Sequence, residues 1–205
     1  MTETEEGIAE IEFDLGLKPG FFTDLKKEED WSFLIKAHVL MESVCSHLLS
    51  SYFSNTKFKE FFSSLEMSDT KKGKIAFLRA AGLIKEEEER FIRGLSKLRN
   101  ETVHRIEGIN FKFSAYIAKL DKQQRNSFVE KFGYAYITED NLGNLTLKDR
   151  EIIITDPKES IWRGVAAILA SIKRRGDTHW IEEQNIKARL KIYEMMKSNK
   201  SEQVT

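Results

Sequence analysis

The segment 31-WSFLIKAHVLMESVCSHLLSSY-52 carries a clear helical periodicity. Its apolar positions recur at steps of three and four, which is the spacing of one face of an α-helix. At 3.6 residues per turn, the pattern predicts an amphipathic helix of about six turns that begins near Asp30. The positions on its inner face are Trp31, Leu34, Ala37 or His38, Met41, Val44 or Cys45, Leu48 and Tyr52.

Similar spacing predicts several helices after this segment. In the segment 71-KKGKIAFLRAAGLI-84, Ile75, Leu78 and Leu83 lie at helical spacing, with Gly82 as the C-cap, since glycine readily adopts the left-handed conformation at that position. Residues 85–104 form the next long helix, and residues 111–120 another that continues or restarts over 121–133. The inner side of the helix over 85–104 is formed by Phe91, Ile92, Leu95, Leu98 and Thr102.

The last third of the chain is predicted in two parts. Residues 134–155 hold Gly143 between two β-branched stretches, so the segment allows a small hairpin; the alternative is an irregular excursion. Asp156-Pro157 followed by Glu159 is a typical helix start, and this helix is expected to end at Gly176. A final helix is expected over 179–197.

The predicted fold is nearly all α, and it has three parts. Residues 1–27 are rich in acidic side chains and are expected to form a loosely ordered arm with a turn at Leu17–Gly20. Residues 28–133 form a helical bundle, and residues 134–205 form a linker or hairpin plus two helices packed on the bundle. Only two prolines interrupt the chain, which favours long helices over a turn-rich β architecture.

Composition excludes several classes of protein. The 205 residues include 33 basic and 33 acidic side chains, so no overall positive field marks a nucleic-acid binder. No apolar run approaches the roughly 20 residues that span a bilayer, so a membrane protein is not expected and the cytoplasm is the expected compartment. Cys45 is the only cysteine, which excludes an intrachain disulfide and fits core packing. His38 and His47 lie nine residues apart on different helix faces, so neither a metal site nor a cofactor is expected.

The segment 95-LSKLRNETVHRIEG-108 holds the candidate functional residues. Arg99 offers a permanent positive charge with a donor fork that matches a phosphate. His104 can exchange a proton near neutral pH, and Asn100 lies on the same helix face as His104 and can orient it. RNA carries its own nucleophile, the 2′-hydroxyl, so an Arg and a His are sufficient for its cleavage. The alternative is structural, because Arg99, His104 and Arg105 near a helix C-terminus also compensate the helix dipole.

With its context, this segment resembles the HEPN superfamily. LRNETVH is similar to the Arg-x4–6-His signature of that superfamily, in which a polar residue commonly follows the Arg. FLIKAHVLMESVCSHLLSSYF resembles the first long HEPN helix, with Glu42 as its inward acidic residue. KIAFLRAAGLIKEEEERFIRGLSKLRNETVH resembles a layout found in the mannitol operon repressor family and related HEPN proteins. In this layout a helix is followed by a Gly-Leu-Ile turn and by a second helix that carries Leu-Arg-Asn…His. The resemblance covers residues 31 to about 120.

The resemblance implies an up-and-down helical bundle that forms a homodimer, with a composite, metal-independent endoribonuclease site in stress response or defence. Arg99 would hold the phosphate and His104 would handle the proton, with Asn100, Glu42 and Arg105 in support. Related toxins that a nucleotidyltransferase partner controls carry a Tyr two residues after the His. Ile106 stands there in this chain, so that control is not expected.

The partners and the alternative function remain open at the sequence level. Lys71, Lys72 and Lys74 are weaker candidates for RNA contacts, since no phosphate-binding glycine loop surrounds them. A protein partner such as an antitoxin would also fit the resemblance. The alternative is a non-catalytic HEPN regulator or interaction module, similar to the mannitol operon repressor family, in which Arg99 and His104 have structural roles.

Overall fold

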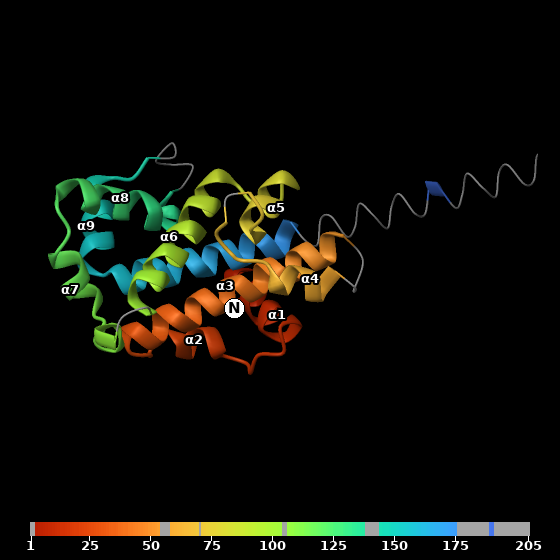
Figure 1. The fold of residues 1–205 in the computed structure, drawn as a ribbon, viewed down its shortest axis with the longest axis horizontal. Helices are drawn as coiled ribbons and strands as arrows, with labels where there is room; N and C mark the ends of the chain where they lie inside the picture. The colour runs from red at the N-terminus through yellow and green to blue at the C-terminus, as the bar shows by residue number, and fades with distance from the viewer. Residues whose placement is uncertain are drawn as a thin grey trace, which may run out of the picture.

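The computed structural model describes residues 3–53, 58–69, 71–103, 106–137, 144–175 and 189–190. Within these residues the protein is all α and has no strand, as predicted (Figure 1). Two short 3₁₀ segments (Ile106–Asn110 and Tyr134–Tyr136) and a helix over residues 157–175 accompany nine α-helices. These nine are α1 (Glu3–Asp14), α2 (Phe21–Leu25), α3 (Asp30–Tyr52), α4 (Phe58–Ser64), α5 (Lys74–Ala80), α6 (Glu86–Val103), α7 (Phe113–Ala118), α8 (Lys122–Phe132) and α9 (Leu147–Thr155).

The long helix α3 is the centre of the fold, and it confirms the helix predicted from residue 30 to 52. It packs against α4, α5 and α6, and Figure 1 shows it running across the middle of the molecule. Its apolar stripe is buried, because these side chains face the neighbouring helices rather than water. The buried residues include Phe33, Leu34, Ala37, Met41, Val44, Cys45 and Leu48.

The helix pair α5–α6 follows the predicted layout and carries the candidate site. Gly82 ends α5 with a φ of 68°, which a residue with a Cβ adopts only with strain. The backbone N–H of Leu83 donates to the Leu78 carbonyl at 2.8 Å and that of Gly82 to Arg79 at 3.0 Å, the two bonds of a Schellman motif. Beyond α6, helices α7 and α8 lie within the predicted spans 111–120 and 121–133.

The prediction of a loosely ordered N-terminal arm is wrong for the described residues of that segment. They form α1 and α2, and Ile11, Phe22 and Leu25 are buried in the core. Glu12 fixes the turn between the two helices, since its carboxylate accepts hydrogen bonds from the Gly20 N–H at 2.8 Å and the Phe22 N–H at 2.7 Å. The acidic composition of this segment predicted a solvent-exposed, loosely ordered chain. One of its acidic side chains, Glu12, is instead buried and fixes the turn through its two hydrogen bonds.

The prediction of a small hairpin over residues 134–155 is also wrong. Tyr134–Tyr136 is a 3₁₀ turn and Leu147–Thr155 is helix α9, while residues 138–143 lie outside the described part of the chain. Thr146 and Asp149 form a reciprocal capping box that starts α9. This cap overrides the strand preference of the three consecutive isoleucines that follow.

The helix over residues 157–175 belongs to the same hydrophobic core as the rest of the described chain. Asp156 caps its first turn, as predicted, by accepting a hydrogen bond from the Glu159 N–H at 3.1 Å. Trp162 stacks on Phe22 of α2 with ring centroids 4.9 Å apart. The helix predicted over 179–197 lies outside the described residues except for positions 189–190, which are helical.

Among the described residues, no helix is long and apolar enough to cross a membrane.

Candidate functional site

Arg99 and Asn100 lie in the last turns of α6, and the structure brings them into contact. The Arg99 Nη1 donates to Asn100 Oδ1 at 2.9 Å. Arg99 is half-buried, and its Nε is a buried donor that has no hydrogen-bond partner in the described part of the chain. None of the ion pairs among the described residues includes Arg99. Among the described residues, the Arg99 guanidinium therefore has no carboxylate partner.

His104 and Arg105, the other two residues of the predicted motif, lie outside the described part of the chain. The structure therefore neither joins them to Arg99 nor separates them from it. Their assignment rests on the sequence alone.

Glu42 was expected to hold basic groups from a neighbouring helix, and the basic group it contacts is Lys74 of α5. The Lys74 Nζ donates to Glu42 Oε1 at 2.7 Å and to the Ser63 carbonyl at 3.2 Å. The Lys74 side chain is 1% exposed, whereas that of Glu42 is 35% exposed. A buried ammonium needs a partner of opposite charge, so this pair ties α5 to α3.

This burial removes Lys74 from the surface residues that were candidates for contact with RNA. Lys71 and Lys72 remain exposed. Their backbone N–H groups both donate to Asp69 Oδ1, at 2.8 and 2.7 Å. Asp69 therefore fixes the backbone of this loop and leaves the two lysine side chains at the surface.

His38 is a site residue that the sequence reasoning did not connect with Arg99. It lies one turn before Glu42 on α3, is buried, and its Nε2 lies 2.9 Å from the Ser96 Oγ of α6. Its Nδ1 is buried and has no hydrogen-bond partner among the residues that the structure describes. Ser96 is three residues before Arg99 on the same helix, so His38 approaches the side of α6 from which Arg99 projects.

The environment of His38 lowers its pKa from the ordinary value of 6.5. Burial is the main cause, and the positive charges of Arg99 and Lys74 act in the same direction, while Glu42 opposes them. The imidazole is therefore neutral at physiological pH. The site thus places the half-buried Arg99 guanidinium, which can bind an oxyanion, near a neutral and buried imidazole.

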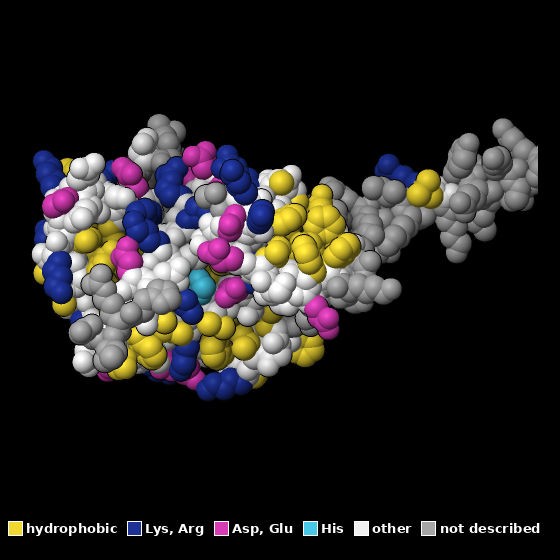
Figure 2. Space-filling view, viewed as in Figure 1, with side chains coloured by type: hydrophobic (Ala, Val, Ile, Leu, Met, Phe, Trp, Pro, Cys, Tyr) yellow, Lys and Arg dark blue, Asp and Glu magenta, His cyan; other side chains and the backbone are white. Residues whose placement is uncertain are grey.

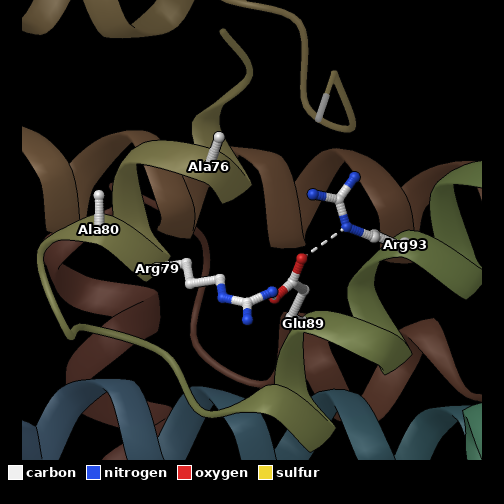
Figure 3. A pocket seen from close by; sticks show the side chains of 5 residues that line it. All are labelled: Ala76, Arg79, Ala80, Glu89 and Arg93. Carbon is white, nitrogen blue, oxygen red and sulfur yellow. Dashed lines mark hydrogen bonds and ion pairs between the residues drawn. The ribbon is translucent and has the colours of Figure 1, made fainter. Parts of the chain in front are cut away.

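Two hollows lie along α6, on the surface that leads to Asn100. The first has a volume of about 590 Å³, and its walls include Arg79, Glu89 and Arg93. Figure 3 shows the two guanidinium groups on either side of the Glu89 carboxylate, with Ala76 and Ala80 beside them. The Arg79 Nη1 donates to Glu89 Oε2 at 3.0 Å, and the Arg93 Nε donates to Glu89 Oε1 at 2.8 Å.

The second hollow has a volume of about 540 Å³ and shares Arg93 with the first. Its other walls include Lys97, Asn100 and Glu101. Figure 2 shows Lys and Arg side chains interspersed with Asp and Glu over the part of this face where Figure 1 places α5 and α6. The sequence signal for these hollows is the spacing of four residues between Glu89, Arg93 and Lys97.

No group of three or more His, Cys, Asp or Glu side chains in the described part of the chain could hold a metal ion. Cys45 is buried in the core, as predicted, and burial raises the pKa of its thiol to about 12.

Comparison of the chain with known protein families, with curated proteins and with solved structures gave no match.

Proposed function

We propose that the chain is an HEPN-type endoribonuclease that acts as a homodimer and cleaves RNA without a metal ion. The observation that carries this proposal is Arg99, a half-buried cation at the end of α6 with no carboxylate partner among the described residues. An anion would stabilise a partly buried cation of this kind. The planar set of N–H donors of a guanidinium matches the oxygens of a phosphate group. The resemblance of the surrounding helices to HEPN proteins supports the same function.

In the proposed reaction, the 2′-oxygen of a ribose attacks the adjacent phosphorus and displaces the 5′-oxygen of the next nucleotide. A base takes the 2′-hydroxyl proton, and an acid gives a proton to the departing 5′-oxygen, so the products end in a 2′,3′-cyclic phosphate and a 5′-hydroxyl. Arg99 stabilises the charge that develops on the phosphoryl oxygens. His104 exchanges the proton, with Asn100 as a positioning residue that holds the Arg99 guanidinium.

A second candidate is a non-catalytic HEPN regulator or interaction module. The observation that favours it is the balance of 33 basic and 33 acidic residues, which gives no overall attraction for a polyanion.

Cleavage of a labelled mixed-sequence RNA in EDTA separates the two functions. The endoribonuclease cuts the RNA, but it leaves a 2′-O-methyl RNA of the same sequence intact because that RNA has no nucleophile. His104→Ala is expected to lose the activity and keep the helical circular dichroism of the wild type. A folded wild type that leaves both RNAs intact points to the regulator.

A further inference from the structure

The two hollows along α6 form one groove, because they share Arg93 and because the residues of α6 that line them follow one another along one side of the helix. Glu89, Arg93 and Lys97 are spaced four residues apart, and Asn100 follows three residues later, so all four lie on one face of α6. At a rise of 1.5 Å per residue, this face extends about 16 Å.

Two cations of the groove present donors to solvent, since the side chains of Arg79 and Lys97 are 65% and 69% exposed. Arg79 gives one bond to the Glu89 carboxylate, and a guanidinium has five N–H donors, so Arg79 keeps donors for a ligand. Arg93 is 27% exposed and donates to Glu89 through Nε and to the Ser68 carbonyl through Nη1, so it offers its remaining donors at the floor of the groove. The remaining acid, Glu101, lies 3.8 Å from the Lys97 Nζ.

The groove also has a direction. Asn100 forms part of the wall of the second hollow, and its Oδ1 accepts the hydrogen bond from Arg99. A chain of phosphates that lies against Arg79, Arg93 and Lys97 therefore continues to the residue that holds Arg99.

We propose that this groove binds the phosphodiester backbone of an RNA strand and leads it to Arg99. The inference rests on the proposed function. It adds three residues that contact the RNA strand before it reaches Arg99: Arg79 of α5, and Arg93 and Lys97 of α6. Contacts to phosphates carry little sequence information, so the groove positions RNA without selecting its sequence.

The test measures the binding of a short fluorescent 2′-O-methyl RNA, which cannot be cleaved, by anisotropy at several salt concentrations. Each phosphate contact contributes about 0.7 to the slope of log K against log salt for a single strand. Arg79→Ala and Lys97→Ala are each expected to weaken binding at low salt and to reduce the steepness of this slope by about 0.7. Arg90→Ala is the matched control, since Arg90 is an exposed cation of α6 that pairs with Glu86 and does not line either hollow.

The outcomes separate this inference from the proposed function. If the wild type binds the RNA and the groove variants bind with the slope of Arg90→Ala, the groove is overturned and the endoribonuclease is untouched. If the groove variants lose affinity as expected but the wild type leaves unmodified RNA intact, the groove stands and the endoribonuclease fails. A folded wild type that binds no RNA overturns the groove as an RNA site, and binding of an acidic peptide instead would assign it to a protein partner.

Discussion

At the scale of single residues, the ion pair between Glu42 and Lys74 joins α3 to α5. Lys74 is buried, and without Glu42 its ammonium would lie in the protein interior with the Ser63 carbonyl as its one remaining partner among the described residues. The sequence indicated that Glu42 holds a basic group, but it could not identify which one. Lys74 is 32 residues away on another helix, and only the packing of α5 on α3 brings it there.

Replacement of Glu42 by Ala is therefore expected to destabilise the fold. Loss of one partner of a buried ion pair typically costs 3–5 kcal/mol, and the partial exposure of Glu42 places this case near the low end, about 3 kcal/mol. Urea denaturation measures the change. Glu86→Ala is the control, because it breaks an exposed pair with Arg90 and is expected to cost less than about 1 kcal/mol. Equal losses in the two variants would contradict the role assigned to Glu42.

The neutral state of His38 predicts how stability depends on pH. The unfolded chain binds a proton at His38 near its ordinary pKa of 6.5, whereas the folded protein, with its lowered pKa, binds it only at lower pH. Between these two pKa values the unfolded state carries more protons, so the contribution of His38 to stability falls as the pH decreases below about 6.5. Burial is the largest cause of this lowered pKa; among the charged groups that face His38, Glu42 on α3 opposes the shift, whereas Arg99 on α6 and Lys74 on α5 add to it.

Urea denaturation over this pH range tests the prediction. His38→Gln is expected to have a shallower loss of stability toward low pH than the wild type. His47→Gln, at an exposed position of the same helix, is expected to follow the wild type. A wild-type slope that persists unchanged in His38→Gln would show that other groups cause it.

At the scale of elements, the described helices that were predicted are those with a local signal. The steps of three and four in α3, the glycine after α5 and the Asp-Pro before residue 158 each act within a few residues of the chain. The helices that were missed depend on distant contacts or on a weak signal. Helix α1 is stabilised by Ile11, which is buried in the core, and by the hydrogen bonds of Glu12. Helix α9 has a local signal, the Thr146–Asp149 capping box, but the isoleucines that follow it favour a strand more strongly.

The contact between α6 and the helix over residues 157–175 yields a third prediction. A Cβ added at Gly164 would lie 2.1 Å from Cε2 of Phe91, which is fully buried and has no room to move aside. In a helix, alanine is normally more stable than glycine by about 1 kcal/mol. Overpacking of a core costs about 1–3 kcal/mol, and a distance as short as 2.1 Å places the cost at this site at the upper end of that range. Gly164→Ala is therefore expected to lose about 2 kcal/mol of unfolding free energy.

Gly7→Ala is the matched control for this prediction. An added Cβ at Gly7 of α1 would meet its nearest neighbour, Ala170, at 3.9 Å, which is an ordinary contact. This variant is expected to be neutral or to gain up to about 1 kcal/mol from helix propensity. If chemical denaturation shows Gly164→Ala to be as stable as Gly7→Ala, then α6 and the helix over residues 157–175 do not pack as closely as described.

At the scale of the whole molecule, one core joins residues from the N-terminal helices to the helix over 157–175. Buried residues from all three parts that the sequence suggested belong to this single cluster, for example Phe22, Phe91 and Ile161. The sequence singled out Arg99, Asn100 and Glu42 on predicted helices, and Arg93 follows from its spacing of four residues from Glu89 and Lys97 on α6. His38 and Arg79 join the site and the groove through tertiary packing, which no local pattern of the sequence reveals.

The role of Arg99 in RNA cleavage is tested by the cleavage of labelled RNA in EDTA by the wild type, Arg99→Ala and Arg90→Ala, with identification of the product ends. We expect the wild type and Arg90→Ala to produce 2′,3′-cyclic phosphate ends at similar rates. We expect Arg99→Ala to lose at least about a hundredfold in rate, the usual effect of removing a group that stabilises transition-state charge. Cleavage by folded Arg99→Ala at the rate of Arg90→Ala would contradict the claim that Arg99 holds the reacting phosphate.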